Sequence, residues 1–340
     1  MRKISMLSIL CAILLMSAGS VHAIVYEVGP GKTYASIQDA VDAVAATDLP
    51  GPLTDNASLR DKEIRVFPGS YTENVSIPAD PAGSAWNTVN DGWTIRADQR
   101  GTVTVNGGFS IGNGRDSLVF DGIDIMVADG QHGVAMFGGT NRFMMFKNMV
   151  VDGRNAAAWA SGIYHDAGFG QNSANHVTIV NMGSHGIRST NSSGWYISNS
   201  ILANNNNGTG KEASFVGINH SNIFGNTTNC NPVGSCAEWD SASGPFGNIN
   251  WVGGDPVGLD PQFVSTDPSS PFYLFLEASS PSAGTANPNG LASPPHAWED
   301  RGLGTYLGVT HNNMGARPIP EPASLALLAA GALLGIRRRR

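Results

Sequence analysis

Three short segments in the middle of the chain share a pattern that would gather polar and aromatic side chains on one surface. They are His132–Val134, Ser161–Ile163 and His185–Ile187, and each consists of a polar residue, a glycine and an aliphatic residue. Because alternate side chains of an extended segment point to opposite sides, an inward aliphatic residue places its neighbours outward. The predicted outward set is Ala135, Phe137, Tyr164, Asp166, Arg188 and Thr190.

This outward set contains the residue types that elimination from a uronate sugar requires. The reaction needs a cation that neutralises the sugar carboxylate and a base that removes the adjacent proton. We therefore take Arg188, Tyr164 and Asp166 as candidate catalytic residues, with Arg188 contacting the anionic sugar. The candidate substrate-binding residues are Phe137, Thr190 and Lys211. The alternative interpretation is an exposed arginine–aspartate pair on a solvated sheet.

Other acidic residues suggest two further kinds of site. Asp121 and Asp124 lie on either side of a predicted corner and are candidate oxygen ligands for Ca²⁺, the one cofactor that the sequence suggests. Asp116, Asp152 and Asp166 are candidates for the pair of carboxylates that hydrolyses a glycosidic bond. That assignment depends on the separation of the two carboxylates, which a sequence does not give.

The elements that must position these side chains are short strands separated by corners. Val177–Asn181 and Trp195–Asn199 share one pattern, in which apolar positions alternate with variable ones and asparagine comes last. Aligning the chain on this pattern gives strands that start at Ile64, Trp93, Leu118, Met144, Val177, Trp195 and Ile218, at intervals of 18 to 33 residues. The alignment also places His220 inward, as a core residue.

Four residues after most of these starts stands a glycine or an asparagine. These are the residue types that adopt positive φ at least cost, as a tight corner between two strands requires. The predicted turn ladder is Gly122, Asn148, Asn181, Asn199 and Asn222.

One amphipathic helix is predicted near the start of the chain. Ser36 and Asp39 have the spacing of a helix N-terminus, with an acidic residue in the first turn. Apolar residues then recur at helical spacing and would form one buried face, which consists of Ile37, Ala40, Val41 and Val44. A lone helix before a series of strands suits a cap over the open end of a repeat array.

Strands and turns without crossover helices predict a parallel β-solenoid. The segments GPGKTYASIQDAVDAV, IRVFPGSYTENVSI, DPQFV, SPSAGTA and RGLGTYLG resemble the right-handed parallel β-helix superfamily, which has the pectin-lyase-like fold, over residues 26–309. The resemblance implies an all-β, right-handed parallel β-helix with an N-terminal capping helix. Enzymes of the superfamily generally act on acidic polysaccharides in a groove along one face, but the fold also hosts non-catalytic surface proteins.

The chain divides into three predicted parts. Residues 1–23 have the charged start, apolar core and small-residue cleavage site of a signal peptide. Residues 24–316 form the β-helix domain, and residues 317–340 form a linker and a sorting segment. Within the domain we expect a cap at 26–46, coils at about 62–226 and a closing segment at 227–309.

The C-terminal segment resembles a PEP-CTERM sorting signal. Pro320, Glu321 and Pro322 precede an apolar run at 323–336 and four arginines at 337–340. The resemblance implies processing by an exosortase-type membrane protease of a Gram-negative bacterium. The run is shorter than the roughly 20 residues of a permanent span, and the basic end favours the cytoplasm. We therefore expect transient inner-membrane anchoring, followed by release or retention at the cell envelope.

The charge of the chain limits the classes of binding partner, and its cysteines indicate a disulfide. The chain carries a net charge of −7, and residues 24–317 alone carry 14 basic and 26 acidic residues. Such an acidic surface repels phosphate backbones, so nucleic acid is excluded as a partner. Cys230 and Cys236 remain once Cys11 leaves with the signal peptide, and in an exported chain they predict a disulfide.

These observations predict an exported, envelope-associated monomer that binds or modifies extracellular acidic polysaccharide, by lyase-type elimination if it is catalytic. The alternative is a non-catalytic structural or adhesive surface or matrix protein of the same fold. The chain has no sharp catalytic motif, so binding, elimination and glycoside hydrolysis all stay open at this point.

Overall fold

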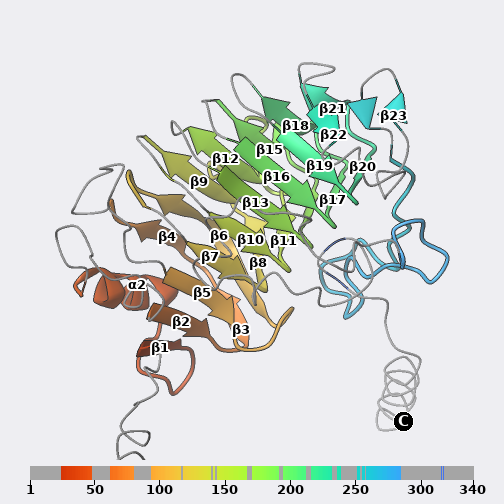
Figure 1. Cartoon of the computed structure of the whole chain (residues 1–340). Coiled ribbons are helices and arrows are strands. Elements are labelled where there is room, and N and C mark those ends of the chain that lie inside the picture. Colours follow the sequence, from red (N-terminus) through yellow and green to blue (C-terminus); the bar gives the residue numbers. More distant parts are fainter. Residues whose placement is uncertain are drawn as a thin grey trace, which may run out of the picture.

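The chain winds into a right-handed parallel β-helix in which strands of successive coils stack on one another (Figure 1). The computed structural model describes residues 24–47, 62–79, 93–115, 118–138, 141, 144–166, 171–190, 194–211, 216–231, 236–238, 251–252, 255–256, 258–284, 315 and 317. The predicted signal peptide and the segment 318–340 lie outside these residues. No helix among the described residues is long and apolar enough to cross a membrane.

Each coil contributes a strand to a nine-stranded parallel sheet, which we call sheet A. Its strands, in order, are β1 (Ile24–Val28), β2 (Lys62–Val66), β5 (Trp93–Ala97), β7 (Val119–Asp121), β10 (Met145–Lys147), β13 (Gln171–Asn175), β16 (Gly194–Ser198), β19 (Val216–Asn219) and β22 (Cys236–Glu238). The coils therefore continue past residue 226, where the sequence predicted their end.

A second, 13-stranded parallel sheet is divided by the long strand β6 (Val103–Ile111), whose two halves pair with different neighbours. Sheet B contains β3 (Gly69–Tyr71), the first half of β6, β8 (Ile123–Val127), β11 (Val150–Asp152), β14 (Thr178–Val180), β17 (Ile201–Ala203) and β20 (Asn222–Phe224). Sheet C contains β4 (Asn74–Ile77), the second half of β6, β9 (Val134–Phe137), β12 (Ile163–Asp166), β15 (His185–Ser189), β18 (Asn207–Lys211) and β21 (Thr228–Asn231).

The three sheets enclose a core of stacked aliphatic and aromatic side chains. Phe120 contacts Phe109 on one side and Phe146 on the other, with ring centroids 5.1 and 5.3 Å apart. Trp195 continues the stack at 6.0 Å from Phe146. Each ring is less than 3 % exposed, so the stack removes a large apolar area from water, the main favourable term in folding.

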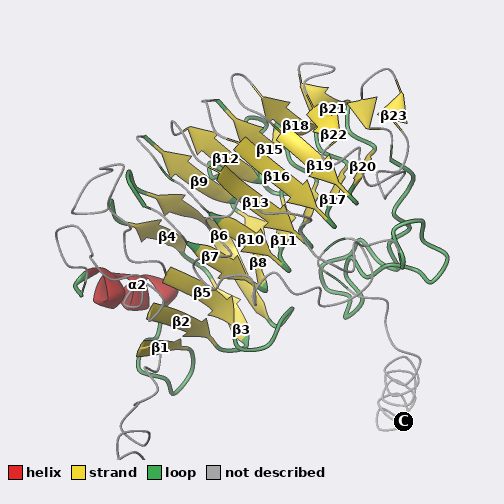
Figure 2. Ribbon diagram, viewed as in Figure 1, coloured by secondary structure: helices red, strands yellow, loops and turns green. Residues whose placement is uncertain are grey.

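The predicted helix is present as α2 (Ile37–Ala45), and it covers the N-terminal end of the core (Figure 2). The Ser36 side chain accepts a hydrogen bond from the Asp39 amide at 3.1 Å. The Glu73 carboxylate accepts from the amides of Ile37 and Gln38 at 2.9 and 3.0 Å. An acid from the first coil thus satisfies the helix N-terminus and ties the cap to the coils.

The corner between sheets A and B is a column of residues with positive φ. In chain order it consists of Gly122, Asn148, His176, Asn199 and His220, with φ of 74°, 54°, 53°, 50° and 44°. These residues lie 26, 28, 23 and 21 positions apart, a steadier period than the sequence alignment gave. The Asn199 amide donates to Asn175 Oδ1 at 3.0 Å, which links neighbouring coils.

The predicted ladder is wrong at two positions, and His220 is a corner residue rather than a core residue. Val177–Asn181 runs into sheet B, where β14 pairs with β17, so it does not stack on Trp195–Asn199. Asn181 turns the chain from sheet B toward sheet C, in line with Asn204, and Asn222 begins β20. The strand that does stack on β16 is β13, whose sequence QNSAN has almost no apolar signal.

The described part of the closing segment, residues 258–284, does not close the end of the rod. It packs on the outer face of sheet B, on the side of the rod away from β9 and β12 (Figure 1). Tyr273, Leu274 and Leu276 form a second apolar cluster there with outward residues of sheet B, which are Val150, Val180, Ile201 and Ala203. A short antiparallel pair, β23 (Trp251–Val252) and β24 (Asp255–Pro256), precedes this segment.

Candidate functional site

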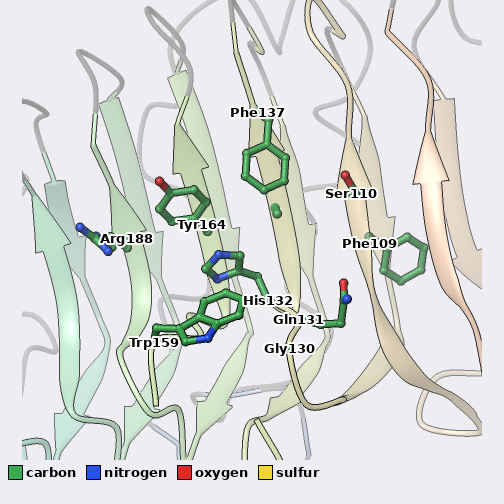
Figure 3. A pocket seen from close by; sticks show the side chains of 10 residues that line it. Phe109, Ser110, Gly130, Gln131, His132, Phe137, Trp159, Tyr164 and Arg188 are labelled. Carbon is green, nitrogen blue, oxygen red and sulfur yellow. The ribbon is translucent and has the colours of Figure 1, made fainter. Parts of the chain in front are cut away.

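A groove of about 430 Å³ lies on the outer face of sheet C. Figure 3 shows aromatic side chains from successive strands gathered along it, with Arg188 at one end. The lining residues are Phe109, Ser110, Gly130, Gln131, His132, Ala135, Phe137, Trp159, Tyr164 and Arg188.

The register of sheet C positions the groove residues. Ile163 pairs with Val134 and with Ile187, and all three are buried in the core. The next residues, Tyr164 and Arg188, are therefore neighbours on the outside of the sheet. Outward alternation thus places these side chains as the sequence predicted.

The glycine that precedes each of these aliphatic residues has a steric role. A Cβ atom on Gly133 would lie 2.5 Å from the carbonyl oxygen of Gly162. A Cβ atom on Gly162 would lie 2.7 Å from the carbonyl oxygen of Gly186. Side chains at these positions would push the coils apart, so the glycines allow the backbones to approach closely enough for sheet C to form.

Four aromatic side chains form a connected platform in the groove. The His132 ring stacks on Tyr164 with centroids 4.5 Å apart and planes 6° apart. Trp159 meets His132 edge-on at 4.9 Å, and Phe137 lies 5.9 Å from Tyr164. Trp159 and Phe137 are 53 % and 45 % exposed, so the platform presents apolar surface to solvent.

The sequence did not predict roles for His132 and Trp159. His132 lies two residues before the start of β9, whereas Trp159 lies in the connection between β11 and β12 and lines the same groove. The sequence signal for such a connection is the longest interval in the alignment of strands, 33 residues between Met144 and Val177.

His132 is held as a neutral ring. Its Nδ1 atom accepts a hydrogen bond from the Ser161 amide at 3.0 Å, which places the ring proton on Nε2. Burial, assisted by the positive charge of Arg188, lowers the pKa of His132 from 6.5 to about 4. At neutral pH the groove therefore contains a neutral imidazole beside a permanent cation.

The other predicted site residues fall partly inside and partly outside this groove. The Arg188 guanidinium lies 5.8 Å from the centroid of the Tyr164 ring, within the range of cation–π contacts. Asp166 accepts a hydrogen bond from the Thr190 hydroxyl at 2.6 Å, but neither residue lines the groove. The residue in register with Arg188 on β18 is Gly210 and not Lys211, whose side chain lies outside the described residues.

The structure separates the acidic candidates onto different sheets. Asp121 on β7 pairs with Lys147 at 3.3 Å, whereas Asp124 on β8 pairs with Arg317. The Ca²⁺ expectation is therefore wrong for this pair, because the two carboxylates point away from different sheets and each has its own cation. Asp152 is buried on sheet B, away from Asp166 on sheet C, so these two do not form a hydrolytic pair.

Two further predictions involve residues that the structure does not describe in full. Asp116, the third candidate for the hydrolytic pair, lies outside the described residues. Cys230 is buried on β21 and is disulfide-bonded, but the side chain of Cys236 lies outside the described residues. The pairing of these two cysteines stays a prediction.

A comparison with protein families confirms the sorting motif that the sequence predicted. Residues 318–340 match the PEP-CTERM protein-sorting motif, which indicates export and C-terminal processing and is consistent with an exosortase-type partner. The crystal structure of pectate lyase Pel9A is similar at 13 % identity and a TM-score of 0.35, over 87 % of this chain and 96 % of that one. A search of curated protein sequences found no match. The chain is thus a parallel β-helix protein with a PEP-CTERM sorting motif.

Proposed function

We propose that this exported β-helix protein binds an extracellular acidic polysaccharide in the groove of sheet C. The observation that carries the proposal is the exposed aromatic platform with Arg188 at its end. The volume of the groove, about 430 Å³, is within the usual range for small-molecule sites.

The platform supports sugar rings as the occupant. One face of a pyranose presents C–H groups, which pack against aromatic rings, while its hydroxyl groups keep contact with water. Exposed apolar groups bordered by polar ones mark interaction sites, and Trp159 and Phe137 are two of the six exposed large hydrophobic residues in the described structure. Arg188 adds a fork of N–H donors that matches a carboxylate. A uronate-containing polysaccharide satisfies both features.

The groups around Arg188 favour binding over elimination. His132 is the histidine among the lining residues of the groove, but its Nδ1 atom accepts a hydrogen bond from the Ser161 amide and its pKa is about 4. Such a ring is a weak base at neutral pH. Elimination is the second candidate function, favoured by the position of Tyr164 beside Arg188.

The test is a glycan array with the full exported chain, followed by titration of the best ligand with variants. Trp159→Ala is expected to weaken binding at least about tenfold, since loss of one stacking surface costs roughly 1.4 kcal/mol. Arg188→Gln is expected to abolish the preference for uronate over neutral glycans. Leu259→Ala is the matched control, because Leu259 is similarly exposed at 49 % but lies on the closing segment.

Two results would overturn the proposal. One is the absence of any glycan ligand for the wild-type chain. The other is unchanged affinity in Trp159→Ala. Release of unsaturated uronate by the wild type, lost in Arg188→Gln, would replace binding by elimination as the function.

A further inference from the structure

The two described residues that precede the sorting motif are docked on the outer face of sheet B. The Gly315 amide donates to the carbonyl oxygen of Asn199 at 2.7 Å. The Arg317 guanidinium forms an ion pair with Asp124, and these two side chains are 14 % and 7 % exposed. We call Gly315 and Arg317 the strap. The motif begins at residue 318, directly after it.

The docking site of Arg317 is built from three sheet and loop features. Asp124 also accepts a hydrogen bond from the Val150 amide at 3.1 Å, which fixes the carboxylate. A Cβ atom on Gly101 would lie only 1.7 Å from Nη1 of Arg317, so the guanidinium occupies space that a side chain would fill. The Phe275 ring of the closing segment lies 5.8 Å from the guanidinium carbon. The Asp124 carboxylate, the space beside Gly101 and the Phe275 ring together form a site that suits an arginine side chain.

Gly315 fits its own part of the face equally closely. It is buried and has a φ of 83°, which favours glycine. A Cβ atom there would lie 2.6 Å from Thr178 Oγ1 and 2.8 Å from Ile201 Cδ1. A larger residue would therefore be expelled from the face, while the coils beneath it would be unchanged.

The strap runs backward along the rod. Asp124, Val150, Thr178 and Ile201 are register partners in four successive coils of sheet B. Gly315 lies over Thr178 and Ile201, whereas Arg317 reaches Asp124 in an earlier coil. Arg317, the last described residue before the sorting motif, therefore lies at the side of the rod and not at its end.

We propose that the strap holds the rod on its side at the membrane while the sorting motif is inserted, with sheet B toward the lipid and sheet C away. Five residues separate Arg317 from Ala323, where the apolar run begins, and they span at most about 17 Å. The nine stacked strands of sheet A extend over roughly 38 Å. A tether shorter than the rod, fixed at its side, keeps that side nearest the bilayer. The inference rests on the sorting motif and does not depend on glycan binding.

The experiment measures energy transfer from the full, unprocessed chain in neutral phosphatidylcholine vesicles to acceptors on the lipid headgroups. A donor is attached at Phe137→Cys on sheet C or at Val264→Cys on the closing segment, two positions of similar exposure at 45 % and 41 %. Label bound to the unsubstituted chain gives the background. Transfer from position 264 is expected to exceed transfer from position 137.

Gly315→Val is expected to abolish this difference by releasing the strap. Gly284→Val is the matched control, since Gly284 also has a positive φ of 66° but nothing lies within 4 Å of its Cβ position. The double variant D124N/R317Q releases the strap by a second route, without leaving a buried charge unpaired. Equal transfer from the two positions in the wild type overturns the proposal, as does an undiminished difference in both released variants.

Discussion

Sheets B and C are built by the same coils, yet their outer faces differ in the side chains that they present and in what packs on them. The outward residues of sheet B are largely aliphatic, and Tyr273, Leu274 and Leu276 cover them. The outward residues of sheet C include Phe137, Tyr164 and Arg188, which line the groove (Figure 3), and Phe137 is 45 % exposed. A strand that is apolar on both sides must be covered on both sides, whereas alternating strands leave one face free for a ligand.

The two outer faces also differ in how their functional side chains are buried. On sheet B, Asp152 is fully buried and accepts hydrogen bonds from Tyr273, Arg154 and Asn181. Burying a carboxylate is costly unless it is fully paired, so these contacts lock the closing segment in one position. On sheet C, the aromatic rings of the groove are stacked but partly exposed, and they keep surface available for binding.

The largest expected effect comes from Tyr273→Ala on the covered face. This change removes a ring from the second apolar cluster and a donor from buried Asp152, so we expect a loss of about 3–5 kcal/mol in the free energy of unfolding. The measurement is urea unfolding followed by circular dichroism. Phe137→Ala on the open face is the matched control, with an expected change within about 0.5 kcal/mol. Similar losses in both variants would contradict the comparison.

A smaller effect is expected from acid on the open face. The pKa of His132 is about 4 in the folded chain, below its usual 6.5, so the unfolded chain binds the proton first as pH falls. The free energy of unfolding should therefore decrease between pH 6.5 and 4. His132→Phe, which keeps the stacked ring, should flatten part of this slope. Fully buried His165, whose pKa is also lowered to about 4, should account for a remaining part. An unchanged slope in His132→Phe would show that His132 is not the titrating group.

The fold could be predicted to the extent that it depends on local chemistry. Positive φ selects glycine and asparagine at Gly122, Asn148 and Asn199, and helical spacing marks α2. The outward face of sheet C followed from strict alternation after Val134 and Ile163.

The predictions that failed depended on contacts between residues that are far apart in the sequence. The inward positions of β13 are Asn172 and Ala174, and Asn172 is tolerated in the core because its Oδ1 atom accepts from the Met144 amide. No apolar pattern marks such a strand, so Val177–Asn181 was placed in the wrong sheet. The position of Trp159 could not be predicted for a related reason, since its ring contacts His132, which lies 27 residues earlier in the chain.

The smallest expected difference compares single hydrogen bonds to carboxylates on the two faces. Thr190→Val removes the hydroxyl that donates a hydrogen bond to Asp166 at 2.6 Å. Because Asp166 is only partly buried, water can replace the lost donor. We expect a loss below about 1 kcal/mol. Tyr273→Phe removes one donor from Asp152, which water does not reach, and should cost roughly 1–3 kcal/mol. Unfolding of both variants at pH 7 measures the two losses. If Thr190→Val costs as much as Tyr273→Phe, water does not reach Asp166 either, and the contrast between the two carboxylates is wrong.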